Sequence, residues 1–180
     1  MAFSVSQFRS KGIARGGARP NLFQTTLTNV PAGVPIPVGS SEGGWSFVCK
    51  IASIPASTVA AVEVPYFGRQ VKVPGNRTFA DWTITILNDN QYSVRNAFEE
   101  WSNLINSHDG NVGPASLGEI FQTWQVEQLD QSGNTIKTYE FQGCWPIEVG
   151  AIDLSADAND TIEEYTVTIA YQFWTSDTTS

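Results

Sequence analysis

Residues 78–87 alternate apolar and polar side chains, and a helical period follows almost at once. Ala80, Trp82, Ile84 and Ile86 fall on one side of this segment, which is the period-two pattern of a strand with one buried face. A strand and a helix that each carry one apolar face need partners to cover those faces. We therefore expect the helix to pack against the outside of a sheet.

The predicted helix covers residues 93–108. Its apolar side chains recur at helical spacing, with Phe98 and Trp101 at the centre of the stripe, and this pattern indicates one buried face. Ser93 suits the N-cap position, and Gly110 suits the position just after the helix end.

Further strands are predicted by alternation and by turn residues between the segments. They cover residues 22–27, 45–51, 62–73, 119–129, 135–142, 145–152 and 162–174. Residues 62–73 contain a strand, a bend at residues 66–69 and a second strand, and a Pro-Gly-Asn turn is predicted at residues 74–76. The pattern favours a mainly β fold, an antiparallel two-sheet β-sandwich or a barrel, with one flanking α-helix.

The composition is that of a single globular domain. The chain has 180 residues, of which 41% are hydrophobic, and this is enough to build one core. The apolar runs are too short to cross a membrane, and the first residues lack the order of a signal peptide. We therefore expect the protein to mature in the cytoplasm of the cell that makes it, with Cys49 and Cys144 as unpaired thiols.

Charge is distributed unevenly along the chain, whose net charge is −8. Arg9, Lys11, Arg15 and Arg19 are basic, and no acidic residue precedes Glu42. Residues 1–20 are also rich in glycine, which predicts a flexible basic arm. This arm either attracts the acidic body of a neighbouring copy or is a solvated tail of no consequence.

The sequence offers little for catalysis or for binding a metal or cofactor. His108 is the only histidine, so a zinc site next to Asp109 lacks ligands. Asp153, Asp157 and Asp160 lack the central glycine and the ligand spacing of a calcium loop. The acidic body also argues against stable binding of nucleic acid, because such binding depends on neutralising phosphates. We therefore expect no enzymatic activity and no cofactor.

Four segments follow one another in a characteristic order: SKGIARGGARPNLF, VEVPYFGRQVKVPGNRTFADW, ITILND and RNAFEEWSNLINSH. Together they resemble the tail tube proteins of contractile-tailed bacteriophages of the T-even type. The resemblance is strongest from residue 10 to residue 108, and the C-terminal half matches more loosely. Long ordered segments are a far more specific signal than a short motif.

The resemblance implies a structural protein of the virion. In that family a β-sandwich with one helix forms hexameric rings, in which the sheets of neighbouring copies join into one large barrel, and the rings stack into a tube. Phage DNA passes through this tube during tail contraction. The implied partners are further copies of the chain, the tail sheath protein, the baseplate hub, the tape-measure protein and the tail terminator. Assembly is expected in the host cytoplasm.

The resemblance also divides the chain and suggests where it makes contacts. Residues 1–20 would be the arm, residues 21–174 the tube domain and residues 175–180 a frayed tail. Polar strand faces would line the lumen, where double-stranded DNA slides without specific binding; the candidates are Asp81, Thr83, Thr85, Gln125, Glu127, Thr138, Glu140, Thr166 and Thr168. Candidates for contacts between subunits are Arg9, Lys11, Arg15, Arg19, Trp45, Tyr66, Phe67 and Arg69.

The sequence is also compatible with two other functions. The related secreted tube of bacterial contractile injection machines shares the implied fold and ring geometry. A β-sandwich binding module that grips a carbohydrate or peptide with exposed tryptophans is the alternative from a different class.

Overall fold

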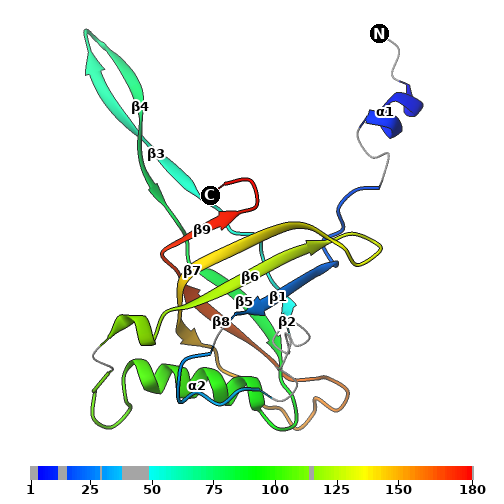
Figure 1. The fold of residues 1–180 in the computed structure, drawn as a ribbon, viewed down its shortest axis with the longest axis vertical. Coiled ribbons are helices and arrows are strands. Elements are labelled where there is room, and N and C mark those ends of the chain that lie inside the picture. The colour runs from blue at the N-terminus through cyan, green and yellow to red at the C-terminus, as the bar shows by residue number, and fades with distance from the viewer. Residues whose placement is uncertain (1–3, 12–15, 29, 38–48, 114–115, 180) are drawn as a thin grey trace.

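The structure is a computed structural model that describes residues 4–11, 16–28, 30–37, 49–113 and 116–179 (Figure 1). It contains two α-helices, α1 (Val5–Lys11) and α2 (Ser93–Ile105), and a short 3₁₀ helix at Leu117–Glu119. The described strands are β1 (Phe23–Leu27), β2 (Cys49–Ile51), β3 (Thr58–Tyr66), β4 (Arg69–Thr78), β5 (Trp82–Leu87), β6 (Gln122–Leu129), β7 (Thr135–Val149), β8 (Glu164–Ala170) and β9 (Phe173–Ser176).

Seven of these strands form one antiparallel sheet that folds back on itself at β7. The order is β1-β6-β7-β8-β5-β2, and β9 pairs with β7 as well. The first part of β7 pairs with β6 and β9, and its second part pairs with β8. We call β1, β6, β9 and the first part of β7 the β6 half, and β2, β5, β8 and the rest of β7 the β8 half.

The two halves pack face to face around an aromatic core. Trp82 of β5 stacks on Phe141 of β7 with 4.5 Å between ring centroids, and it meets the edge of Trp124 of β6 at 5.5 Å. All three side chains are almost completely buried. The predicted mainly β sandwich is therefore confirmed, with one continuous bent sheet in place of two separate ones.

Helix α2 lies against this sandwich (Figure 1) with its apolar stripe buried, as predicted. Phe98 stacks on Trp124 with a centroid separation of 6.2 Å. The ends of the helix differ from the prediction. Ser93 is the first helical residue rather than the N-cap, and the carboxylate of Asp89 accepts its backbone N–H at 2.8 Å. The helix ends at Ile105 rather than 108, so Gly110 does not terminate it.

Four predicted strands have different limits in the structure. Residues 79–81 interrupt the predicted strand 78–87, because Phe79 turns inward to lie against Tyr171 while Ala80 is exposed. Strands 135–142 and 145–152 are one strand, β7. The predicted strand 162–174 is divided after Ala170, because β8 pairs in one half of the sheet and β9 in the other.

The predicted turn at residues 74–76 is also wrong, because β4 runs straight through it. The pairing of β3 with β4 shifts register between Val59 and Ala61, opposite this segment. Gly75 fits there because a side chain would meet the Ala60 carbonyl oxygen at 3.0 Å. The glycine therefore accommodates a bulge in the ladder rather than a reversal of the chain.

The hairpin formed by β3 and β4 projects from the body, and the arm with α1 projects toward the same end of the molecule (Figure 1). Helix α1 shows that part of the predicted flexible arm is helical. At the other terminus β9 continues through Ser176, which forms an isolated bridge with Thr179. The described residues include no helix long and apolar enough to cross a membrane.

Candidate assembly surfaces

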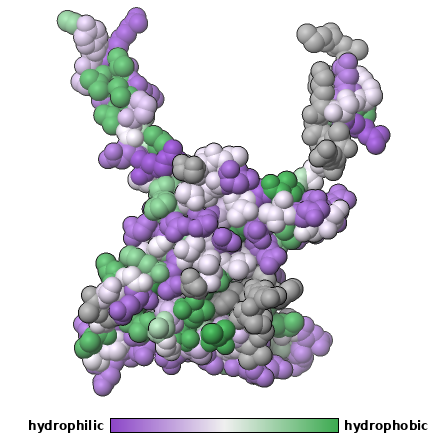
Figure 2. All heavy atoms as spheres, viewed as in Figure 1, coloured by the Kyte–Doolittle hydropathy of each residue, from purple (hydrophilic) through white to green (hydrophobic). Residues whose placement is uncertain are grey.

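The projecting hairpin has one apolar face that no described residue of the chain covers. Val62 lies opposite Val73, and Val64 lies opposite Val71, so the four side chains share one face of the two-stranded sheet. Each is between 45% and 52% exposed. Figure 2 shows apolar residues along this projection. An isolated two-stranded hairpin is marginally stable in water, so this face suits a partner.

The other face of the hairpin is polar. Glu63 lies opposite Lys72, with 3.7 Å between the amine and a carboxylate oxygen, and Pro65 lies opposite Gln70. Both charged side chains are well exposed, so this ion pair adds little stability. The hairpin is therefore amphipathic, with one face suited to a protein surface and one suited to water.

The tip of the hairpin, residues 66–69, combines backbone strain with exposed aromatic rings. Phe67 has a φ of 43° and is 92% exposed, and Gly68 has a φ of 79°. Positive φ at both central residues is the requirement of a type I′ turn, which favours Asn-Gly. A phenylalanine in this conformation is a genuine outlier. Tyr66 meets its ring edge-on at 4.7 Å, and Arg69 pairs with Tyr66 across the ladder.

Positive charge is concentrated on the two projections. Of the ten Lys and Arg residues, seven lie in residues 1–20 or 58–78, whereas sixteen of the eighteen acidic residues lie at or after Asp81. The other three basic residues are each ion-paired with an acidic residue; the pairs are Lys50 with Glu164, Arg95 with Glu99 and Lys137 with Asp177. Of the described basic side chains, Arg9 lies on α1 and Arg69, Lys72 and Arg77 lie on β4, so the two projections are more basic than the body.

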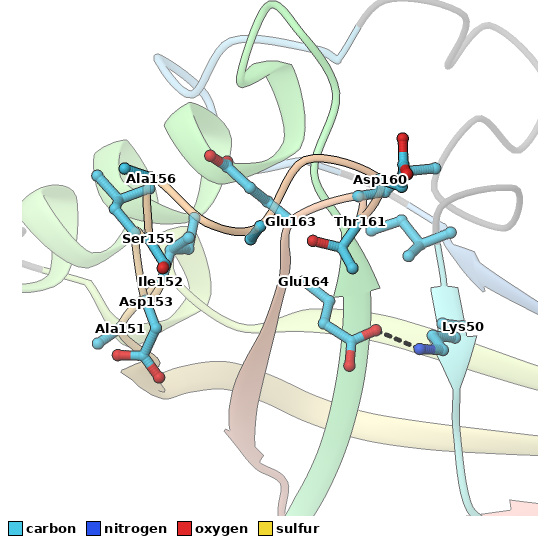
Figure 3. A pocket seen from close by; sticks show the side chains of 14 residues that line it. Lys50, Ala151, Ile152, Asp153, Ser155, Ala156, Asp160, Thr161, Glu163 and Glu164 are labelled. Atoms are coloured by element: carbon cyan, nitrogen blue, oxygen red, sulfur yellow. Dashed lines mark hydrogen bonds and ion pairs between the residues drawn. The ribbon is translucent and has the colours of Figure 1, made fainter.

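An open groove of about 900 Å³ lies on the body, lined by residues 151–156, 158 and 160–164 together with Lys50 and Leu87. We call it the acidic groove, since its lining has four carboxylates and one amine. Asp153 and Asp160 lie on opposite sides of it (Figure 3), and Glu164 is joined to Lys50. Hydrogen bonds from Asn88 and Tyr92 lower the pKa of Glu163, which keeps that carboxyl ionised.

The predicted lumen residues fall into two groups. Gln125, Glu127, Thr138 and Glu140 lie on the outer face of the β6 half, where Gln125 pairs with Glu140 and Glu127 with Thr138. Thr83, Thr85, Thr166 and Thr168 lie on the outer face of the β8 half, paired in the same way, and Asp81 directly precedes that strand.

Alternation places these two groups on opposite surfaces of the sandwich, because the facing sides of both halves form the core. In the first group the carboxylate of Glu140 accepts hydrogen bonds from Gln125 and Gln142. One subunit turns only one of its two outer surfaces toward a tube axis. At most one group therefore lines a lumen.

The predicted contact residues are only partly brought together. Tyr66, Phe67 and Arg69 meet at the hairpin tip. Arg9 is exposed on α1, and Arg19 is exposed at the start of the body, where its carbonyl accepts a hydrogen bond from Gln128. Arg15, Trp45 and the side chain of Lys11 lie outside the described residues. The acidic groove was not predicted; its lining comes from the ends of the predicted strands 145–152 and 162–174 and from the residues between them.

The described residues hold no group of three or more histidine, cysteine or acidic side chains that could bind a metal ion. His108 is engaged with Asn103, with 3.0 Å between ring nitrogen and amide oxygen. Cys49 and Cys144 are both free, and burial raises their pKa values to about 11 and about 12. Such thiols remain protonated near neutral pH and are poor nucleophiles.

The positions of the tryptophans test the alternative function, a binding module that holds a ligand on exposed tryptophans. Trp82, Trp101 and Trp124 are among the most deeply buried side chains of the protein. Trp145 and Trp174 are half-buried and pack against the core. The tryptophans of the described segments are therefore packing residues rather than an exposed platform.

Comparison with known proteins decides the family. Residues 18–177 match the phage tail tube protein family. The chain belongs to this family. The tail tube protein gp19 of Enterobacteria phage T4 is 30% identical over 158 residues, covering 87% of this chain and 90% of its own. The tail tube protein of Serratia phage KSP90 is 32% identical to this chain over 173 residues, and the match covers 93% of this chain and 94% of the phage protein.

Solved structures show the same fold at lower sequence identity. One is a protein in the sheath/tube terminator of an extracellular contractile injection system in its extended state, with a TM-score of 0.65, 12% identity, and coverage of 89% of this chain and 96% of the other. A chain in the baseplate of the anti-feeding prophage has a TM-score of 0.64 at 12% identity, and the match covers 89% of this chain and 95% of the other. The predicted family and fold class are confirmed, and the tail tube protein is a structural component of the phage virion.

Proposed function

We propose that the chain is the repeating subunit of the inner tail tube, in which hexameric rings stack and phage DNA passes through the bore. The observation that carries this proposal is the hairpin of β3 and β4, whose apolar face and strained aromatic tip are exposed on the single chain. A permanently exposed apolar strand pair is a liability for a protein that stays monomeric. Neighbouring copies would remove it.

Ring closure is supported by the open edges of the sheet. Among the described strands, β1 and β9 of the β6 half each pair on one side only. Their unpaired backbone groups suit pairing with a neighbouring copy. A head-to-tail contact that closes by rotation produces a ring, and repetition along an axis produces a tube. Each subunit would then supply one segment of a continuous barrel wall.

For the lumen we propose the outer face of the β6 half, with Gln125, Glu127, Thr138 and Glu140. This face carries two carboxylates, of which Glu140 accepts hydrogen bonds from Gln125 and Gln142, whereas the opposite group is mainly threonine. A wall of acidic and amide groups stays hydrated and repels phosphates, whereas a basic wall would hold DNA through the release of many counterions. DNA would therefore slide without specific binding.

The remaining partners are proposed from the relatives and from the charge pattern. The similar solved chains come from a sheath-tube complex, a baseplate and a tube-terminating cap. We infer that this chain likewise meets the sheath, the baseplate hub and a terminator, and that the tape-measure protein occupies the bore before DNA. Assembly would take place in the host cytoplasm, with the basic arm of residues 1–19 contacting the acidic surface of a neighbour.

Electron microscopy of the purified full-length chain at high concentration tests the proposed function. Hollow rods built of stacked rings are the expected result. Small particles of constant mass at every concentration, with or without a purified baseplate as a nucleus, would contradict it. Deletion of residues 1–19 should leave a folded subunit that polymerises poorly; unchanged tube length and yield would refute the role of the arm.

The lumen assignment has its own test in phage particles. Replacing Glu127 and Glu140 with lysine should impair DNA delivery while particles still assemble, because the lysines would bind phosphates. Replacing Thr83 and Thr166 with lysine is the matched control on the opposite surface and should leave delivery intact. The reverse pattern would assign the lumen to the β8 half.

A further inference from the structure

We propose that the hairpin tip of one copy, through Phe67 and Arg69, enters the acidic groove of a second copy in the next ring. This inference rests on the proposed function and names the two surfaces that stack. The hairpin tip and the segment of residues 151–164, which lines most of the groove, lie toward opposite ends of the molecule (Figure 1). Two different surfaces at opposite ends give a contact that repeats without closing, which generates a filament.

The first argument is the strain at Phe67. A non-glycine residue in the left-handed region is uncommon, and asparagine, aspartate or glycine normally occupies this position of a type I′ turn. Here a large aromatic side chain occupies it and is almost fully exposed. Within a single copy the ring buries little apolar surface that could offset the strain. Strained residues persist where function requires them, and a protein pocket in another copy supplies that function.

The second argument is charge. Arg69 has no ion-pair partner among the described residues, and the same holds for Asp153 and Asp160 at the groove. The groove already neutralises its own amine, since Lys50 is paired with Glu164. It therefore presents excess negative charge to a guanidinium, which binds carboxylates well.

The third argument is the apolar content and size of the groove. Leu154 is 79% exposed and Ile162 is 68% exposed, beside the carboxylates. The leucine and isoleucine of the groove can pack against the aromatic rings of the tip, and the carboxylates can pair with the arginine. A volume of about 900 Å³ is at the upper end of the range, roughly 300–1,000 Å³, of pockets that enclose a drug-sized ligand. The groove is therefore large enough for the ring of Phe67 and the side chain of Arg69.

A charge swap tests the pairing. Arg69→Glu and Asp160→Arg should each lower the fraction of protein that sediments as tubes by about tenfold or more, because each places like charges at the contact. The double variant should recover most of the loss. Asp157→Arg is the matched control, because Asp157 lies on the same loop and is exposed but does not line the groove; it should stay within about twofold of the unaltered chain.

Phe67→Asn separates docking from folding. Asparagine suits the turn better than phenylalanine, so the variant should fold normally by circular dichroism and thermal unfolding, yet lose tube formation. Tubes that form normally in Phe67→Asn, an Asp160→Arg variant that behaves like Asp157→Arg, or a double variant no better than the single ones would overturn the pairing. If the unaltered chain forms no tubes, the proposed function itself fails; if it forms tubes that ignore these substitutions, only the pairing fails.

Discussion

Arg95 joins helix α2 to the segment that leads into the acidic groove, and its replacement by methionine tests how that segment is held. The side chain is only 19% exposed. One guanidinium nitrogen donates to the backbone carbonyl of Gly150 at 2.9 Å, another pairs with Glu99 at 2.7 Å, and the charge lies 5.0 Å from the ring centroid of Tyr165.

These three contacts have very different expected strengths. An exposed ion pair with i,i+4 spacing contributes about 0.3–0.5 kcal/mol. A hydrogen bond from a charged donor contributes about 1.5–3 kcal/mol, and the contact with the tyrosine ring adds about 0.5–1 kcal/mol. We therefore expect Arg95→Met to lower the free energy of unfolding by about 2–4 kcal/mol, and Glu99→Gln by less than about 0.5 kcal/mol.

Equilibrium urea unfolding, followed by tryptophan fluorescence at concentrations too low for assembly, measures both values. Arg95→Lys serves as a further comparison, since a lysine cannot make both planar contacts at once. Equal losses in Arg95→Met and Glu99→Gln would show that the ion pair dominates, and a loss below about 1 kcal/mol in Arg95→Met would refute the reasoning.

Three other predictions concern the core, the acid-dependent contacts and the thiols. Phe98→Ala should cost about 3–5 kcal/mol in urea unfolding because the ring is fully buried against Trp124, whereas Glu100→Ala on the exposed side of the helix should change little. The pKa of the Glu163 carboxyl is lower in the folded protein than in the unfolded chain. The ionised carboxylate therefore stabilises the fold above the unfolded-state pKa, and this stabilisation is lost as pH falls through the folded-state pKa. The difference in unfolding free energy between the unaltered chain and Glu163→Gln should be largest at about pH 7 and disappear in acid. Cys144 should resist iodoacetamide at about pH 8 until urea unfolds the protein, because burial raises its pKa to about 12.

Local patterns in the sequence predicted the elements whose two faces differ sharply. The alternation around Trp82 and Ile84 and the stripe around Phe98 both describe buried faces in the structure. The predictions failed where a strand changes partner. Nothing near Ala170 in the sequence says that the chain leaves one half of the sheet and joins the other, because that bend is set by pairing with a distant part of β7.

The assembly surfaces were predictable only in part. The bend at residues 66–69 could be predicted because Gly68 separates two segments of alternating residues. The division of the polar residues between two opposite surfaces depends on which strands pack face to face, and alternation alone does not contain this information. The acidic groove is formed by residues far apart in the sequence, such as Lys50 and Asp160.

A cryo-electron microscopy reconstruction of the assembled chain would show directly how the rings contact one another. We expect a hollow tube of stacked six-membered rings in which density for the Phe67 side chain lies against residues 151–164 of a subunit in the adjacent ring. A tube whose hairpins extend freely into solvent, or a particle with no repeating contact between the two ends of the molecule, would contradict it.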